Sequence, residues 1–376
     1  MTNNDLLLQE LRTLWNSESE KKRKRETQQV FQIYLQDWKY LVKEHLRRLF
    51  SEELVLQLTP KINTSLNLLK WVVDELSQIY TKEPERVLEK PDKEPALKLY
   101  EAKGELNLAL DRATRVCFAL RELVIRPHRT SRGISLELIT PDRVSVLSSE
   151  EDLTKIKAIA IQLNETQIAV WTDTHFYSCG NAFEIEKEQP NPYGVIPYMV
   201  AHASFPTMKF WHHEESFGLR DLTLSTAIAL TDHAHLRHLQ SFKQIWIKAD
   251  ETDEGIQEVV LDPSRILRLQ GNASVGTIDL TTDLQKHLDS ILGEAAAGVA
   301  LWGLRHEQLK GTLDVSSGVA LSLKMVNQIK IWDKQRRIWQ VWEDQLWKLS
   351  NKIFLRDQNP GDLFVEFNEL LPSFES

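Results

Sequence analysis

The chain is 376 residues long, with 42% hydrophobic and 27% charged residues, which is the composition of a folded protein and leaves room for two or three compact units. The formal net charge of −8 means that the surface as a whole does not attract nucleic acid, which argues against a tight DNA binder. The N-terminus lacks a charged segment followed by an apolar core, and no stretch approaches about 18 uninterrupted apolar residues. Neither a secretory signal nor a membrane span is therefore expected, and the protein is expected to be made in the cytoplasm.

The sequence contains two cysteines, Cys117 and Cys179. Both lie in apolar or strand-like surroundings, which favours structural thiols in a reducing compartment over a disulfide between them.

The first third of the chain is predicted to be helical. One helical stretch covers 5–57 and is expected to be interrupted by the basic run Glu20–Glu26, which is interpreted as a solvated helix face, with contact to nucleic acid as the alternative. A second helix is predicted over 62–80, before Glu83-Pro84, and a third over 95–125. The second helix has an apolar face made of Leu69, Val72, Val73, Leu76 and Tyr80.

From Gly133 to Ala203 the pattern changes to short alternating segments separated by turn formers. Ile134–Leu138, Ile156–Leu163 and Ile168–Trp171 show the alternation that is typical of strands. The segment Asn191–Pro197 is predicted to be a tight turn before a strand that starts with proline. The region is therefore predicted to be an antiparallel meander.

The second half is helical again. Helices are predicted over 218–242 and 283–302, with a strand-rich patch over 245–278 between them, so the three segments should form a hairpin with the patch at its tip. A polar, glycine-bracketed loop follows over 303–312. The longest helix is predicted over 319–355, and a closing strand over 363–367. The apolar stripe of the long helix consists of Met325, Ile329, Trp332, Trp339, Trp342, Leu346, Leu349 and Ile353. Because a small domain cannot bury such a helix, it is expected to pack across several elements or a neighbouring subunit.

This order of parts resembles the portal proteins of tailed phages, especially the siphophage family of Bacillus-phage type. Four stretches carry the resemblance and together span about residues 60–372; they are Asn67–Pro84, Gly133–Pro141 with Asn191–Pro197, Ser316–Leu321 and Leu363–Pro372. Two departures stand out. Leu120–Leu123 replaces a tyrosine-glycine or similar pair of the family, and the family's C-terminal helical crown has no counterpart, because the chain stops at Ser376.

The resemblance implies an α+β, mainly helical portal fold. Its parts would be a wing over 1–216, stem helices over 217–245 and 283–303, a small α/β clip over 246–282, a tunnel loop over 304–318, and a long wing helix with closing strand over 319–376. It further implies a non-enzymatic portal-vertex subunit without cofactors, present in the virion as a ring of about twelve copies that is assembled in the host cytoplasm. The implied partners are the terminase large subunit, a head–tail adaptor, the major capsid or scaffolding protein, and double-stranded DNA that passes through non-specifically during packaging and ejection.

The candidate channel residues fall into two groups. In the tunnel loop, the cations Arg305, His306 and Lys310 would form a positive collar that contacts phosphates without reading bases. The whole candidate loop set is Leu304, Arg305, His306, Glu307, Gln308, Lys310 and Thr312. The candidate stem residues, which would line the subunit boundary or the channel, are His233, His235, His238, Lys243 and Lys286. Among these, His235 and His238 are expected on one helix face.

Two alternatives come from other classes of function. His212, His213, Glu214 and Glu215 could bind the metal of a hydrolase, although they lack the helical two-histidine spacing of a zinc hydrolase. The chain could also be an acidic α+β scaffold protein. No phosphate-binding glycine loop and no nucleophile elbow occurs in the sequence, which favours a protein that is not an enzyme. The tryptophans of the long helix are interpreted as packing residues and not as platforms for bases.

Overall fold

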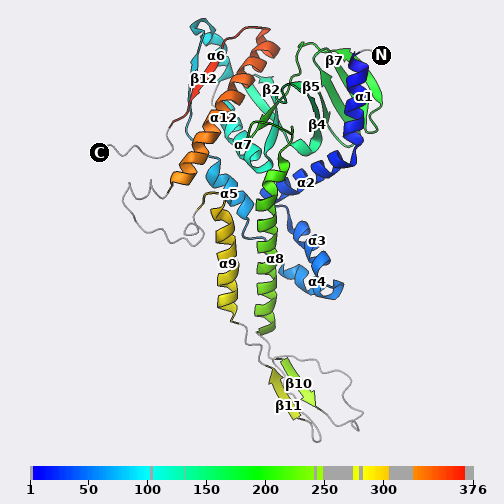
Figure 1. The fold of residues 1–376 in the computed structure, drawn as a ribbon, viewed down its shortest axis with the longest axis vertical. Helices are drawn as coiled ribbons and strands as arrows, with labels where there is room; N and C mark the ends of the chain where they lie inside the picture. Colours follow the sequence, from blue (N-terminus) through cyan, green and yellow to red (C-terminus); the bar gives the residue numbers. More distant parts are fainter. Residues whose placement is uncertain are drawn as a thin grey trace, which may run out of the picture. The chain divides into compact units, whose positions relative to one another are not determined.

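The computed structural model describes residues 3–101, 105–131, 133–240, 244–248, 274–278, 283–304 and 325–368. The chain divides into two compact units: the first unit contains 1–38, 67–221 and 299–376, and the second unit contains 39–66 and 222–298. Helices and strands are both abundant (Figure 1), which confirms the predicted mixture of helix and sheet. A membrane-spanning helix is absent from the part of the chain that the structure describes.

Two helices open the first unit, α1 (Asn3–Asn16) and α2 (Glu18–Tyr34). They are separated at Ser17, whose backbone is extended and whose hydroxyl accepts a hydrogen bond from the Glu20 N–H at 3.2 Å, as an N-cap does. The predicted interruption at the basic run 20–26 is therefore wrong, since α2 continues through it.

The basic run is also not a uniformly solvated face. Glu20 and Arg23 are buried, and the Arg23 guanidinium donates to the Glu20 carboxylate and to the backbone oxygen of Val144, both at 2.6 Å. The Ser145 hydroxyl donates to the same carboxylate at 2.7 Å. The two charges therefore attach α2 to the start of a strand, while Lys21, Lys22 and Arg25 remain exposed.

The next helices are shorter than predicted. They are α5 (Leu68–Leu76), α6 (Glu94–Tyr100) and α7 (Glu105–Leu120). The apolar face predicted for the first of them is buried as expected. Helix α7 ends because Arg121 adopts a positive φ of 73°, and strand β2 (Glu122–Thr130) starts at once. Pro127 is tolerated inside β2 because β9 pairs only with residues 122–125, so the proline lacks a partner on that side.

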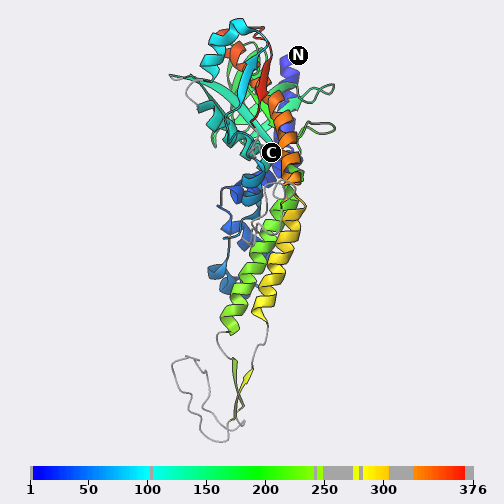
Figure 2. The same ribbon diagram turned by 90° about the vertical axis from the view of Figure 1, so that its left-hand side faces the viewer.

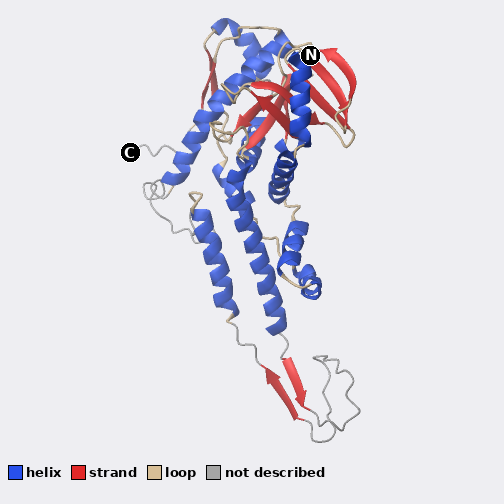
Figure 3. Ribbon diagram, turned by 45° about the vertical axis from the view of Figure 1, so that its right-hand side comes forward, coloured by secondary structure: helices blue, strands red, loops and turns tan. Residues whose placement is uncertain are grey.

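Two antiparallel sheets form the body of the first unit. One has the order β3-β2-β9, with β3 at Gly133–Ile139 and β9 at Met199–His202. The other runs in sequence order from β4 to β8, which confirms the predicted meander over these strands, whereas β3 and β9, predicted within the same meander, belong to the first sheet. Figure 3 shows the strands in red. Its strands are β4 (Val144–Ser148), β5 (Ile156–Gln162), β6 (Gln167–Thr172), β7 (His175–Gly180) and β8 (Ile185–Pro190).

Strand β5 shows how the alternation serves two cores. Ile159 and Ile161 join a cluster with residues of the three-stranded sheet, while Ala158 and Ala160 point to the other face and pack with Leu11 of α1. Alternate residues of a strand face opposite sides of a sheet, so one short strand contributes to both layers. Cys117 and Cys179 are free and buried, which confirms the structural interpretation of both thiols.

Helix α12 (Val326–Ser350) continues through a π-helical turn over Asn351–Leu355. It contacts α5, β2, β9 and β12, which confirms that it packs across several elements. The predicted stripe is confirmed at Trp332, Trp339, Trp342, Leu346 and Ile353, which are buried, whereas Met325, Ile329 and Leu349 are only partly buried. The first residues of the predicted helix lie outside the described residues. The closing strand, β12 (Leu363–Glu366), pairs with β1 (Glu85–Leu88), a strand that the sequence did not predict.

The second unit contains α3 (Lys39–Leu49) and α4 (Glu52–Leu58), followed by most of α8 (Phe217–Gln240) and α9 (Leu284–Ala300). Leu222 lies against Gly298, and His233, eleven residues further along α8, stacks on His287, eleven residues back along α9. The two helices are therefore antiparallel, and Figure 2 shows them side by side from a second direction. Strands β10 (Gln244–Lys248) and β11 (Ser274–Ile278) pair antiparallel between them in the sequence. The predicted helix–strands–helix hairpin is confirmed over these residues.

Candidate functional site

Of the predicted tunnel loop, the structure describes only its first residue. Leu304 has a buried side chain. It follows Gly303, whose φ of +85° ends α9 in the manner of a glycine cap. A side chain at position 303 would also meet Ile331 of α12. The other six residues, Arg305, His306, Glu307, Gln308, Lys310 and Thr312, lie outside the described residues. The positive collar therefore stays a prediction.

The candidate stem residues contact different neighbours. The His233 ring stacks on His287 with centroids 5.5 Å apart. Burial lowers the pKa of His233, and the nearby His287 lowers it further. His235 is buried, and its Nδ1 lies 2.8 Å from Lys61 Nζ. His238 is exposed whereas His235 is buried, so the two side chains differ in environment although they were predicted on one face of the helix. Lys286 is exposed and pairs with Asp283 at 3.2 Å. Lys243 lies outside the described residues.

The residues of the hydrolase alternative do not converge. His213 Nε2 lies 3.6 Å from a Glu26 oxygen, Glu214 lies 3.3 Å from Lys209 Nζ, and Glu215 accepts a hydrogen bond from Arg121 at 2.6 Å. Among the described residues, only His212 of these four lies near two other potential metal ligands at once. The four side chains thus contact different partners, and the metal site that was the alternative prediction for these residues is not formed.

His212 instead belongs to a cluster that sequence reasoning missed. Its backbone N–H donates to the Glu122 carboxylate, and its Nδ1 lies 3.8 Å from that carboxylate. Glu122 of β2 is paired directly with His202 of β9, so their side chains share one face of the sheet. Glu122 and His202 are 80 residues apart in the sequence, and no local spacing could have indicated their meeting.

The cluster is deeply buried. Glu122 is 0% and His202 is 1% exposed. Burial raises the pKa of Glu122 to about 8 and lowers that of His202 to about 3, because the charged form of each group loses its solvation. The His202 ring packs between Phe210 and Trp342, with centroids at 5.0 and 5.8 Å, and this contact fixes its place.

A second buried polar network holds the closing strand. Arg86 of β1 donates to Glu343 of α12 at 2.5 Å and to Asn107 at 2.7 Å, and the Tyr80 hydroxyl donates to the same glutamate. Arg86 and Glu343 have side chains that are 1% and 0% exposed. All four tryptophans of α12 are buried, namely Trp332, Trp339, Trp342 and Trp347. The interpretation of these tryptophans as packing residues is confirmed.

The outward side of α12 carries a short basic stripe. Lys330, Lys334 and Arg337 are exposed at intervals of four and three residues, with the exposed Val326 and Val341 beyond the two ends. None of the three cations forms an ion pair with an acidic side chain among the described residues. The stripe was not predicted, because the apolar pattern of the opposite face dominates this part of the sequence.

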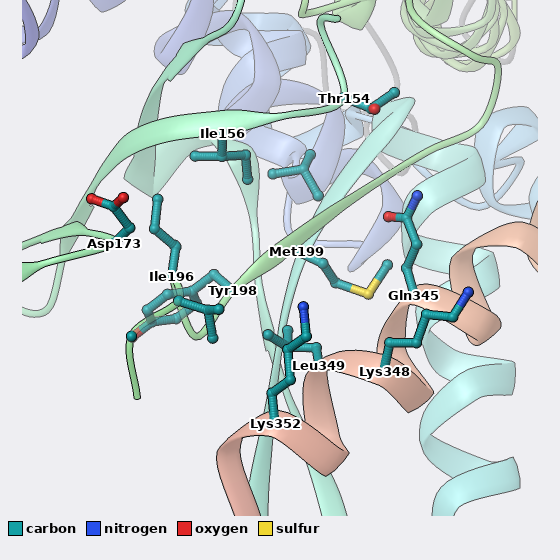
Figure 4. Close-up of a pocket in the computed structure, with 13 residues that line it drawn as sticks. Thr154, Ile156, Asp173, Ile196, Tyr198, Met199, Gln345, Lys348, Leu349 and Lys352 are labelled. Atoms are coloured by element: carbon teal, nitrogen blue, oxygen red, sulfur yellow. The ribbon is translucent and has the colours of Figure 1, made fainter. Parts of the chain in front are cut away.

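A hollow of about 430 Å³ opens between β5, β9 and the C-terminal end of α12 (Figure 4). Met199 and Tyr198 line it together with Lys348 and Lys352. Lys348 is already neutralised by Asp344 at 2.7 Å and by Asp362 at 2.5 Å. The hollow contains none of the predicted site residues, and its side chains form no nucleophile–base pair.

No protein-family model matches the chain, and no curated protein matches it. Solved structures do match. The chain is similar to a chain in the virion of a native gene transfer agent particle, with 11% identity, 83% of each chain covered and a TM-score of 0.44. It is also similar to a chain in the neck of an empty particle of this kind, computed with C6 symmetry, with 10% identity, 84% of each chain covered and a TM-score of 0.46. For a chain in the neck of the native particle, computed with C12 symmetry, the identity is 11%, 81% of each chain is covered and the TM-score is 0.43. At these values the similarity by itself establishes neither a common fold nor a common function.

Proposed function

We propose that the chain is a portal-vertex subunit, a non-enzymatic component of a ring-shaped channel for packaging and ejecting double-stranded DNA. The proposal includes docking of the terminase large subunit and of head–tail adaptors, contact with the major capsid or scaffolding protein, and a place in the virion. Its support is the order of parts along the chain, which resembles tailed-phage portal proteins in sequence.

The observation that carries the proposal is the antiparallel pair of α8 and α9. The helices have 24 and 17 residues, which corresponds to about 36 and about 26 Å at 1.5 Å per residue. The strand pair β10–β11 lies between them in the sequence, as a clip lies between two stem helices. The proposed parts are a wing (1–216), stem helices (217–245 and 283–303), a clip (246–282), a tunnel loop (304–318), and the long wing helix with its closing strand (319–376).

The surface of the long helices fits a subunit with neighbours. On α9 only Ile291, Ala295, Ala296 and Val299 are buried, whereas Leu284, Leu288 and Leu292 are partly exposed. Val341 on α12 is also exposed. In a ring, a second copy would cover these apolar side chains and remove them from water. With a net charge of −8 per chain, a ring of about twelve copies would repel DNA from its walls and let it slide.

The test is the size and shape of the purified full-length chain. Light scattering after gel filtration, followed by negative-stain electron microscopy, is expected to show rings with a central hole at micromolar concentration. A monodisperse monomer under these conditions would contradict the proposal and would favour the acidic scaffold protein.

A pair of variants on α12 sharpens this test. Val341→Glu places a charge on the exposed side and is expected to raise the concentration needed for assembly at least about tenfold. Gln340→Glu adds the same charge at the preceding position, about 100° around the helix from that side, and is expected to assemble like the wild type. Equal assembly of both variants would exclude this side of α12 from the contact between subunits.

A further inference from the structure

We propose that Glu122, His202 and His212 form a binding site for a transition-metal dication of the zinc type. The ion would connect β2, β9 and the segment that follows β9, all within the first unit. The site does not depend on the proposed function, because its residues were not among the channel candidates and its geometry lies inside one unit.

The first support is convergence. One ligand atom from each of the three side chains lies within 4.8 Å of the ligand atoms of the other two. In a tetrahedral zinc site with metal–ligand distances near 2.1 Å, neighbouring ligand atoms are about 3.4 Å apart. The Glu122–His202 pair is held by direct cross-strand pairing, so His212, in the segment after β9, is the ligand that would move to reach this spacing. Among the described residues, no other group of three potential ligands comes together in this way.

The second support is a set of unsatisfied polar atoms. Both ring nitrogens of His202, Oε2 of Glu122 and Nδ1 of His212 are buried and have no hydrogen-bond partner among the described residues. A buried carboxylate and a buried imidazole normally have such partners, since leaving them without one is costly. One cation would satisfy an atom of each residue at once.

The chemistry of the donors selects the metal. Two imidazoles and one carboxylate are the donor set of many zinc sites, whereas calcium and magnesium prefer oxygen ligands throughout. Three protein ligands leave a fourth position, which a water molecule would occupy. Phe210 and Trp342 hold the His202 ring in place, as an outer shell does around a metal ligand. Binding would release to solvent any proton carried by Glu122.

The experiment uses the full-length chain without a histidine tag. The protein is loaded with Zn²⁺, dialysed, and its metal content measured by mass spectrometry; one ion per chain is expected. Replacement by Co²⁺ is expected to give the visible absorption bands of a tetrahedral site. Glu122→Gln, His202→Gln and His212→Gln are each expected to weaken Zn²⁺ binding by at least about 100-fold. His213→Gln is the matched control, since it alters the adjacent histidine, and it is expected to bind like the wild type.

Circular dichroism identifies variants that fail to fold. If the buried positions 122 and 202 do not tolerate substitution, His212→Gln carries the test, because its side chain is 16% exposed and its removal leaves the sheet pair intact. Wild-type protein that retains no metal and gives no cobalt bands would overturn the site. Retention of the ion by folded His212→Gln would overturn it as well, since the metal would then be bound elsewhere.

Discussion

The two compact units bury different kinds of side chain. The first unit buries large aromatic residues completely, including Trp38, Trp342 and Tyr100. The buried apolar residues of the second unit, among those that the structure describes, are aliphatic: they include Leu46 and Leu58 and, on α8 and α9, the small Ala227 and Ala295. The first unit therefore gains stability from buried aromatic side chains that the described part of the second unit does not have. We expect the second unit to open at a lower free energy than the first.

The units also satisfy their buried polar groups differently. In the first unit, buried charges meet partners that are far away in the sequence, as in Arg86 with Glu343. In the second unit, the buried Thr231 is neutral and has one partner on its own helix and one outside it: its Oγ1 donates to the Ala227 backbone oxygen at 2.7 Å and accepts from the Asn63 N–H at 3.0 Å. Because an unpaired buried charge costs more than an unpaired hydroxyl, substitutions that remove the partner of a buried charge should cost more than substitutions in the hairpin.

The largest effect is expected for Glu343→Ala in the first unit. The change removes the buried carboxylate beside the Arg86 guanidinium, which keeps the partly exposed carboxylate of Glu101 at 3.3 Å, and should lower the free energy of unfolding by about 3–5 kcal/mol. Urea denaturation followed by tryptophan fluorescence measures it, because four tryptophans of the same helix are buried nearby. Glu366→Ala on the exposed side of β12 is the control and should change stability by less than about 0.5 kcal/mol. Similar losses of stability for both variants would contradict a large contribution of the Arg86–Glu343 pair to the free energy of unfolding.

A smaller effect is expected for Gly298→Val in the second unit. A side chain at this position overlaps Leu222 on the facing helix, and overpacking of this kind should cost about 1–3 kcal/mol. Gly293→Ala is the matched control on α9: its added methyl group meets no atom within 4 Å, so the better helix propensity of alanine should stabilise by up to about 1 kcal/mol. Thermal unfolding measures both, and a stabilising Gly298→Val would refute the close packing of α8 on α9.

The smallest effect concerns the His233–His287 pair. Because the pKa of His233 is lowered in the folded state by burial, then by His287 and Arg237, with Asp232 opposing, the unfolded chain takes up the proton first as the pH falls. The contribution of His233 to stability should therefore be fully present above the unfolded pKa of about 6.5 and should decrease by less than about 1 kcal/mol toward pH 5. Relative to the wild type, His233→Gln should make this part of the stability–pH curve less steep, and the control His238→Gln should leave it unchanged. A wild-type curve no steeper than that of His233→Gln would contradict the prediction.

Much of the secondary structure could be predicted from the sequence. The meander from β4 to β8, the helices α8 and α9, and the apolar face of α12 all follow from alternation or helical spacing within one element. Errors occurred where a single residue decided the outcome, as at Ser17, which ends α1, and at Arg121, whose positive φ ends α7. Sequence patterns indicate the type of an element better than its ends.

The candidate site was much less predictable. The histidine–glutamate run 212–215 suggested a metal site, but three of its four residues pair with Glu26, Lys209 and Arg121. The basic run on α2 suggested a solvated face, but Arg23 is buried against Glu20. In both places the local pattern was compatible with exposure, and partners from other elements decided the environment of each side chain.

The sequence by itself determined which segments become helices and strands, because helical spacing and strand alternation are patterns of residues within a single element. It also determined the mixed α and β character of the chain and the burial of the tryptophan face of α12. Only the tertiary structure decided that Glu122 meets His202 across a sheet, that β1 pairs with β12, and that Arg86 reaches Glu343. The reason is physical: the residues of one strand do not specify which other strand it pairs with. A charged residue that becomes buried looks like any other charged residue in the sequence, because its partner comes from a distant segment.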